Sequence, residues 1–448
     1  MNELVRIAAE SVGAKVCVAV EKCPDGMYNK SFVLTMDDGQ EIIAKVPNPN
    51  AGVSYFTTAS EVATMDFFGG LYYTKDLANM PQKNHLYSDN KGNQIWNRQF
   101  AIGPATGRDW FDCGRVHLGC DRGPCAPACP TSGSSANCIA GLSVYDYYKA
   151  IGLREKLAIS TLTKLPKQTV MVCGPGLYQP ERRKKLSAAE GYLQVFDALL
   201  PTEIKSITTP CLWHDDLHDE NIFVDPNDPS KVVGIIDWQS VNLLPLLDHN
   251  PDPAFIVYRG PEPESLDRPE LEDTEGLSEM GKAEAIRKYY EKALFIASRK
   301  IALKKTPAAY DAIEYQKTES FDLLVLARRL LEFGEAHFHA LTVSLRDVWH
   351  DLPANNGLKP PRRFPIVFDD QRLAEIEEDG EKAMCGMQIM NDFKARLGPL
   401  WPDKDAVEHG QYKAAKAALR ALKEEVVEEF GKTEEDKAEL ARQWPFDN

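Results

Sequence analysis

The sequence lacks any apolar run long enough to cross a lipid bilayer. Its longest apolar stretches, such as AGLSVYDYY and ESFDLLVLARRLLEF, are broken by charge or follow helical spacing, whereas a membrane-spanning helix needs about 20 apolar residues. The first twenty residues contain Glu3 and Glu10 and resemble neither a signal peptide nor an Arg-rich, acid-free presequence. We therefore expect a soluble protein with no membrane span and no visible targeting segment.

An excess of positive charge is also missing. The 448 residues contain 52 Lys and Arg against 67 Asp and Glu, for a net charge of -15. Proteins that bind nucleic acid neutralise phosphates with basic side chains, so nucleic acid is excluded as a partner. With 43% hydrophobic residues, the chain can bury a full core in one large or two modest domains.

The cysteines do not form the repeated close pairs of a zinc site. Such sites place two ligands two to four residues apart and repeat the pair further along, but CDRGPCAPACPTSGSSANC has one close pair in a Pro/Ser/Gly-rich setting. Free thiols on a loop in a reducing compartment are favoured over zinc. Five of the ten cysteines lie between residues 113 and 138, namely Cys113, Cys120, Cys125, Cys129 and Cys138.

The apolar pattern predicts a small β-rich part followed by a large helical part. Residues 3–13 have helical spacing, and SFVLTMDDGQEIIAKV reads as a β-hairpin because two Val/Ile/Phe-rich runs flank DDG. A helix is expected over TTASEVATMDFF, whereas residues 69–145 have no regular pattern. This organisation predicts an α+β fold. Further helices are expected over 144–165, 181–200, 281–303, 320–341 and 413–430.

The stretch LWHDDLHDENIFVDP leads into a second predicted hairpin. The runs IFV and VVGII flank the turn-forming DPNDPS, so residues 222–236 should fold back with a tip near Asn227 and Asp228. This register puts Asn221 beside Asp237, where opposed Cα atoms lie about 4.5 to 5.5 Å apart. A carboxylate and an amide oxygen at that separation can hold one Mg²⁺, which prefers oxygen ligands.

Asp216 precedes Asn221 by five residues, in a stretch without regular apolar spacing. A loop can bring its carboxylate to the open end of the hairpin, where it could accept a hydroxyl proton. Phosphoryl transfer needs a base beside a metal pair, because its catalysis consists mostly of positioning and charge neutralisation. The alternative reading is an acidic, solvated turn before a hairpin.

Two residues of the N-terminal part suggest how ATP phosphates could be held. Lys45 lies in the apolar strand EIIAKV, where a buried Lys needs an anionic partner, and Glu61 follows in the next predicted helix. A strand Lys paired with a helix Glu is typical of protein kinases. The turn EKCPDGMYNKSF would cover the phosphates, with Gly26 giving backbone access and Asn29 at its end. Alternatively, Lys45 extends into solvent from an edge strand.

A metal phosphohydrolase of the HD type is a third possibility, built on His214 and Asp215. That site needs histidines on neighbouring helices, but His214 lies between a strand and a loop. His337 and His339 are about 200° apart on a helix, which suits interior or surface positions better than a shared metal.

WHDDLHDENIFV…GIIDWQS resembles the aminoglycoside phosphotransferase and choline kinase type of enzyme. EKCPDGMYNKSFVLTMDDGQEIIAKVPNPNAG, TTASEVATM and CGPGLYQP further resemble the fungal "altered inheritance of mitochondria" phosphotransferase-like proteins. The resemblance implies a bilobal, protein kinase-like fold, dependence on ATP and Mg²⁺, a small-molecule acceptor and a mitochondrial location. It implies His214 as the motif histidine, Asp216 as the base, Asn221 and Asp237 as metal ligands, and Lys45 with Glu61 at the phosphates.

The chain departs from this family at three places. Asp215 stands where many relatives have Gly or Pro, which adds negative charge beside the base. Seven residues separate Glu61 from Gly69, too few for the remaining strands and hinge of a small lobe. We therefore expect a truncated lobe over 1–68, reduced to a two-stranded remnant. The large lobe would span 69–448, with an irregular insertion over about 113–143 whose composition resembles translated intron.

These departures leave an alternative function open. A chain without the adenine-binding strands could be a non-catalytic protein of kinase fold that binds a partner or supports mitochondrial maintenance. The acceptor of an active enzyme is not defined by the sequence, although the acid-rich segment 260–276 could attract a cationic one. Solvated disorder is the simpler reading of that segment.

Overall fold

The structure is a computed structural model of the whole chain. It describes residues 2–23, 29–47, 69–74, 87–88, 94–96, 98, 100–103, 105, 107–118, 143–214, 216–236, 242–253, 255–271, 273–356, 358, 360–401, 407 and 409–447. The predicted helix over TTASEVATMDFF and most of the cysteine-rich segment lie outside these residues. The division between residues 68 and 69 stays a prediction.

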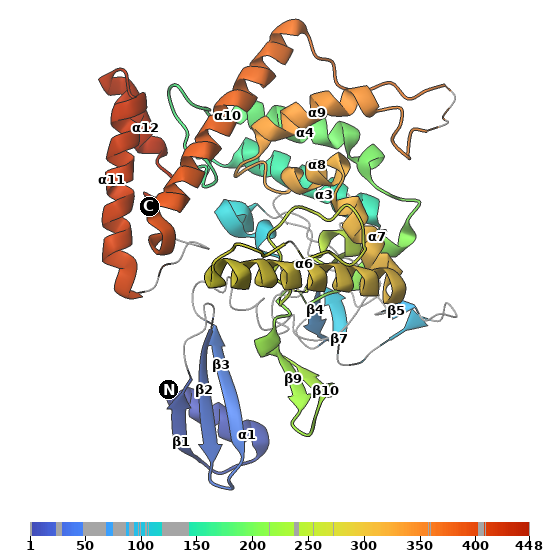
Figure 1. Cartoon of the computed structure of the whole chain (residues 1–448), viewed down its shortest axis with the longest axis vertical. Coiled ribbons are helices and arrows are strands. Elements are labelled where there is room, and N and C mark those ends of the chain that lie inside the picture. Colours follow the sequence, from blue (N-terminus) through green and yellow to red (C-terminus); the bar gives the residue numbers. More distant parts are fainter. Residues whose placement is uncertain are drawn as a thin grey trace.

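An N-terminal helix packs on a three-stranded antiparallel sheet (Figure 1). Phe32, Leu34 and Met36 alternate along the central strand and bury their side chains against Ala8 and Ala9 of the helix. The predicted first helix and hairpin are confirmed, but the two-stranded remnant is wrong, because a third strand and the helix complete a small core. The elements are α1 (Asn2–Val12), β1 (Cys17–Lys22), β2 (Asn29–Met36) and β3 (Glu41–Pro47).

A second sheet joins segments that are far apart in the sequence. Its four strands pair antiparallel in the order β7-β4-β11-β8. The expectation that residues 69–145 contain no regular structure is therefore wrong, because β4 and β7 pair there. The strands are β4 (Gly69–Tyr73), β7 (Phe100–Gly103), β8 (Pro210–Leu212) and β11 (Asn242–Pro245), with a separate pair β5 (Tyr87–Ser88) and β6 (Gln94–Ile95).

The main hydrophobic core lies among five helices in the upper part of Figure 1. Tyr148, Tyr192, Leu324 and Phe338 are fully buried there. The predicted helices over 144–165 and 181–200 are confirmed, but the predicted helix over 320–341 is two helices, because Gly334 adopts a left-handed φ of 92°. The helices are α3 (Val144–Thr161), α4 (Arg182–Leu199), α7 (Pro307–Gln316), α8 (Glu319–Ala327) and α9 (Glu335–Val348).

The C-terminal helices form a second core with the loop around Val172. Val172, Phe393, Leu422 and Trp444 are buried together, and the helix predicted over 413–430 is confirmed. The helices are α10 (Asp370–Leu397), α11 (Tyr412–Phe430) and α12 (Glu434–Gln443). The predicted helix over 281–303 is also confirmed as α6 (Glu279–Lys305), which crosses the front of the helical part in Figure 1. Within the described ranges, no helix is long and apolar enough to span a bilayer.

The second predicted hairpin is confirmed and projects from the helical part beside the N-terminal sheet (Figure 1). Strands β9 (Ile222–Asp225) and β10 (Asp228–Ile235) pair Ile222 with Ile235 and Val224 with Val232. The tip lies at Pro226 and Asn227, one residue earlier than predicted. The small N-terminal sheet and the large helical part together confirm the α+β class.

Candidate functional site

The segment that enters the acidic loop is held by contacts with the chain that follows β11. Strand β8 leads into Trp213, whose indole Nε1 donates to the backbone oxygen of Asn250 at 3.0 Å. The ring of Trp213 stacks on His249 with 6.0 Å between centroids, and Nε2 of His249 lies 3.1 Å from the backbone oxygen of Cys211. His249 is 1% exposed. These contacts tie the start of the loop to the segment that follows β11.

His214 then fixes the loop to the base of the hairpin. Its side chain is buried, and its Nε2 lies 2.8 Å from the backbone oxygen of Ile236. Because a carbonyl oxygen accepts, Nε2 carries the proton in this contact. The histidine of the predicted motif therefore connects the loop to the end of β10, which is a positioning role.

Asn221 organises the loop between these anchors. It ends the short 3₁₀-helix η5 (Asp219–Asn221) and is 5% exposed. Its amide nitrogen donates to the backbone oxygen of Asp216 at 2.8 Å and lies 3.1 Å from Nε2 of His218. Both contacts use the nitrogen, so the amide oxygen is the atom of this side chain that can coordinate a cation.

Asp216 presents its carboxylate to solvent. Its side chain is 72% exposed, and its Oδ2 lies 3.9 Å from Nε2 of His218. Since the amide nitrogen of Asn221 approaches that same ring nitrogen, Nε2 acts as an acceptor there and does not donate to Asp216. The carboxylate therefore stays accessible to a hydroxyl group that approaches the loop.

The open end of the hairpin lies at Asn221, as predicted. The backbone nitrogen of Ile236 donates to the backbone oxygen of Asn221 at 3.0 Å. Asp237 is the next residue in the sequence, but its placement lies outside the described residues, as does that of Asp215. The structure therefore brings the side chain of Asn221 to the backbone of Asp216. Of the two predicted metal ligands, Asn221 is among the described residues and Asp237 is not.

The predicted phosphate-binding residues belong to the N-terminal sheet. The backbone of Lys45 pairs with Ser31 across β2 and β3, which confirms its strand position, and Asn29 pairs with Pro47. Gly26 and Glu61 lie outside the described residues. Asn29 and Lys45 thus belong to the three-stranded N-terminal sheet, whereas the acidic loop follows β8 of the four-stranded sheet. The contact of Asn29 and Lys45 with ATP stays a prediction.

A buried ion pair supports the segment behind the loop and was not predicted from the sequence. Asp248, in η6 (Leu246–Asp248), pairs with Arg328 and accepts a hydrogen bond from Tyr148 Oη at 2.7 Å. Burial by itself lowers the pKa of Arg328, but the surrounding groups, with Asp248 first among them, together outweigh burial and raise this pKa well above its usual value. Gln316 adds hydrogen bonds to the backbone oxygens of Leu247 and His249 at 2.9 and 2.7 Å.

A second buried network ties the 3₁₀ segments before α3 to the same core. Arg115 in η4 (Asp112–His117) pairs with Glu155 at 2.9 Å, and both side chains are fully buried. Arg154 pairs with Asp109 of η3 (Arg108–Trp110) at 2.6 Å and donates to the backbone oxygen of Arg328 at 2.6 Å. The two networks meet at Arg328. Sequence spacing gave no signal for them, because the partners are up to 174 residues apart.

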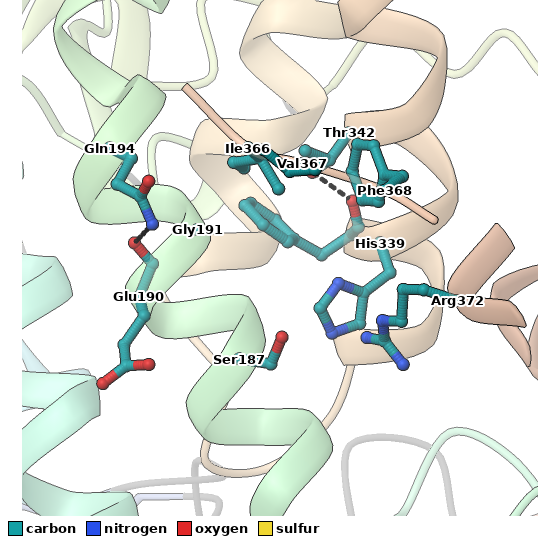
Figure 2. Close-up of a pocket in the computed structure, with 11 residues that line it drawn as sticks. Ser187, Glu190, Gly191, Gln194, His339, Thr342, Ile366, Val367, Phe368 and Arg372 are labelled. Atoms are coloured by element: carbon teal, nitrogen blue, oxygen red, sulfur yellow. Dashed lines mark hydrogen bonds between the residues drawn. The ribbon is translucent and has the colours of Figure 1, made fainter. Parts of the chain in front are cut away.

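The helices of the core also line a partly open cavity of about 150 Å³ between α4, α9, the segment before α10 and the first turn of α10. Figure 2 shows Ser187 and His339 on opposite helices facing this space. His339 is buried, and its Nε2 lies 3.1 Å from the backbone oxygen of Lys184. Burial, and to a lesser extent the charge of Arg372, lowers the pKa of His339 to about 4. The cavity belongs to the helical core and contains none of the predicted site residues.

The histidines of the metal-phosphohydrolase alternative take the positions expected of helix residues. His339 is interior, and His337 is exposed on the same helix. Among the described residues, no group of three or more His, Cys, Asp or Glu side chains could hold a metal ion. The four cysteines from Cys120 to Cys138 lie outside those residues, so the choice between free thiols and zinc stays a prediction.

The acidic loop, the hairpin and the strands β8 and β11 on either side of them lie within a part of the chain that matches a known protein family. Residues 156–247 match the model of the phosphotransferase enzyme family. The match contains His214, Asp216, Asn221 and Asp237, so the resemblance predicted from the sequence is confirmed. The small antiparallel sheet followed by a large helical part agrees with the kinase-like, bilobal fold expected of phosphotransferases of this family.

Curated fungal proteins are similar over most of the chain. A subtelomeric hrmA-associated cluster protein of Aspergillus fumigatus is 29% identical over 359 residues, covering 62% of this chain and 69% of its own. The altered inheritance of mitochondria protein 9 of Lachancea thermotolerans is 23% identical over 382 residues, covering 78% and 54%. Its counterpart from Saccharomyces cerevisiae is 23% identical over 394 residues, covering 83% and 58%. No solved structure matches.

Proposed function

We propose that this protein is a phosphotransferase that moves the terminal phosphoryl group of ATP to a hydroxyl group of a small molecule, with Mg²⁺. The observation that carries the proposal is the hydrogen bond from Ile236 to the backbone of Asn221. It joins Ile236, the residue after β10, to the buried Asn221, while Asp216 lies exposed on the same loop. The family match over residues 156–247 supports this assignment.

Each residue of the loop then has a distinct role. Asp216 orients the acceptor hydroxyl and accepts its proton as the new O–P bond forms, and the nucleoside diphosphate leaves with the electron pair of the broken P–O bond. Asn221 holds the loop through its amide nitrogen and offers its amide oxygen to the cation. His214 keeps the loop on the hairpin through Ile236.

The donor set suits a hard divalent cation. Asn221 and Asp237 would supply an amide oxygen and a carboxylate, the ligand types that Mg²⁺ prefers, and leave other positions for phosphate oxygens. When bound, Mg²⁺ would neutralise charge that develops on the transferred phosphoryl group. Lys45, on β3 of the N-terminal sheet, with Glu61 would contact the phosphates, and Gly26 and Asn29 would flank the covering turn.

Transfer of labelled phosphate from ATP to a panel of hydroxyl compounds tests the proposal. Replacing Asp216 by Asn removes the proton acceptor without changing the shape of the side chain, so turnover should fall by about a hundredfold or more. Because Asp216 is exposed, the thermal unfolding temperature should stay unchanged. The matched control is Asp225→Asn, on the hairpin that follows the loop. Turnover that survives in Asp216→Asn would contradict the assigned role.

A non-catalytic kinase-fold protein is the alternative, and the short sequence between Glu61 and Gly69 favours it. That interval leaves little chain for the strands and hinge that receive adenine in the family pattern. A thermal-shift assay with ATP, with and without Mg²⁺, separates the two, because a ligand that binds the native state raises its stability. A folded protein without any shift would support the alternative.

We infer that the protein acts in mitochondria, on the strength of relatives whose names carry that location. Subcellular fractionation of the protein with an epitope tag at its C-terminus checks this point. A cationic acceptor would suit the acidic segment 260–276, which carries Glu262, Glu264 and Asp267. Comparing amino alcohols with neutral sugars in the transfer assay tests that preference.

A further inference from the structure

Helix α6 is apolar on two opposite faces. Phe295, Ile296 and Arg299 face the body of the protein and are buried. On the opposite side, four large apolar residues follow one another at helical spacing and are exposed. They are Ile286, Tyr290, Leu294 and Ile301, with exposed fractions of 41%, 59%, 59% and 62%. A surface helix normally places polar residues on its solvent face, so this second stripe needs an explanation.

The stripe has the spacing of a helix-packing seam. At 100° per residue, its four side chains fall within about 80° of one another, and Ala283 and Ala297 lie in the same sector. Residues 283, 290 and 297 repeat every seven positions, as do 294 and 301, which is the interval that keeps a seam facing a partner helix. The outer face of α6 therefore fits another helix laid alongside it.

Charge is distributed unevenly along the same element. Helix α6 contains eight Lys and Arg residues and three Glu residues, and its last seven residues contain four basic side chains and no acidic one. The chain that leads into its first turn is strongly acidic, with seven Asp and Glu residues and one Arg over 260–278. Arg268 in that chain contacts Tyr289 of α6 at 2.9 Å, so the acidic segment lies against the N-terminal half of the helix.

We propose that α6 is a self-association surface on which a second copy of this chain packs its own α6 in antiparallel orientation. Antiparallel pairing superimposes the two apolar stripes about a twofold axis near Leu294. It also sets the acidic approach to one helix opposite the basic end of the other, twice. Parallel pairing would put the two basic ends together, which is unfavourable.

The outer face of α6 is small for an interface between two proteins. A helix of 27 residues is about 40 Å long and about 10 Å wide, so the contact covers on the order of 400 Å² per copy. Stable interfaces bury about 800 Å² per partner. The expected dimer is therefore weak and reversible, with a dissociation constant in the micromolar range. The phosphotransferase proposal is independent of this surface, because α6 carries none of the predicted site residues.

Sedimentation velocity of the full chain across low to high micromolar concentrations tests the proposal. The expected result is a reversible shift from the 50.1 kDa monomer to a dimer. Leu294→Asp, in the middle of the stripe, should leave a monomer at every concentration. Leu303→Asp is the matched control, since it adds the same charge at an exposed leucine of the same helix outside the stripe, and it should dimerise like the natural chain.

A charge exchange tests the antiparallel orientation. Lys304→Glu with Lys305→Glu should weaken the dimer several-fold, and adding Glu275→Lys with Glu279→Lys should restore it by reversing the pattern at the other end. A natural chain that stays monomeric at high micromolar concentration would overturn the proposal. A dimer that persists in Leu294→Asp, or one that the four-residue exchange fails to restore, would overturn it as well.

Discussion

The two ends of the segment that carries Asp216 are held in different ways. Its base is fixed by Trp213 and the buried His249, behind which Asp248 and Arg328 form an ion pair in the helical core. Its other end continues into a hairpin whose Phe223 is 51% exposed. The helical core therefore fixes the base of the site, whereas the hairpin extends away from the core and buries little apolar surface.

The residues that stabilise the fold and the residue proposed to perform the chemistry lie at different ends of this segment. Buried charges at the base have partners, because an unpaired charge in a dry interior destabilises a fold strongly. At the exposed end, Asp216 is surrounded by solvent and its removal leaves no buried group unsatisfied. Substitutions at the base should therefore change stability, whereas substitutions at the exposed end should change activity alone.

The largest expected effect on stability is at Arg328. Replacing Arg328 by Met leaves the carboxylate of Asp248 buried without its cation, which should lower the free energy of unfolding by about 3 to 5 kcal/mol. Urea denaturation measures this change. The double variant Arg328→Met with Asp248→Leu removes both charges and should recover most of the loss. If the single variant unfolds like the natural chain, the base is not anchored as described.

Two truncations to alanine compare how much the core and the hairpin each contribute to stability. Leu324 on α8 is fully buried, so Leu324→Ala should cost about 2 to 5 kcal/mol through lost burial and a cavity. Val224 on the hairpin is 41% exposed, and Val224→Ala should change stability by about 0.5 kcal/mol or less. Both variants are read by the same urea titration. Equal losses at the two positions would mean that the hairpin is buried by something beyond its own two strands.

The buried His339 makes the stability of the core depend on pH. Its pKa of about 4 in the folded protein lies below its ordinary value of 6.5, so the unfolded chain binds more protons between these values. Stability should therefore fall as pH drops from about 6.5 to about 4, by up to about 3 kcal/mol from this group. His339→Gln should flatten that slope, and the exposed His337→Gln should leave it unchanged. Identical pH profiles for all three proteins would contradict the burial of His339.

Local sequence signals predicted local structure well. The turn formers DDG and DPNDPS predicted both hairpins, since turn chemistry and flanking β-branched residues act over a few positions. The helix containing Tyr148 and the one containing Tyr192 were predicted by spacing alone. The break at Gly334 was missed, because an apolar period continues across it while the backbone conformation changes.

Contacts between distant residues could not be predicted. Nothing in the spacing of Asp248 and Arg328 indicates that they meet, nor that β8 and β4 flank β11 in one sheet. Such pairs arise from the way helices and strands pack, which no short window of sequence contains. For the site, the order of Asp216, Asn221 and the hairpin was sufficient to predict that the loop brings Asp216 close to Asn221. The contacts of Trp213 and His249 that hold the start of this loop were found only in the structure.

We propose that the hairpin returns Asp237 to Asn221, so that both residues hold a divalent cation beside Asp216. Binding of Mn²⁺ together with ATP, followed by electron paramagnetic resonance, tests it without requiring an acceptor. The natural chain should bind the metal in a nucleotide-dependent way, and Asp237→Ala should abolish that signal while the circular dichroism spectrum stays unchanged. Undiminished Mn²⁺ binding in a folded Asp237→Ala protein would contradict the account.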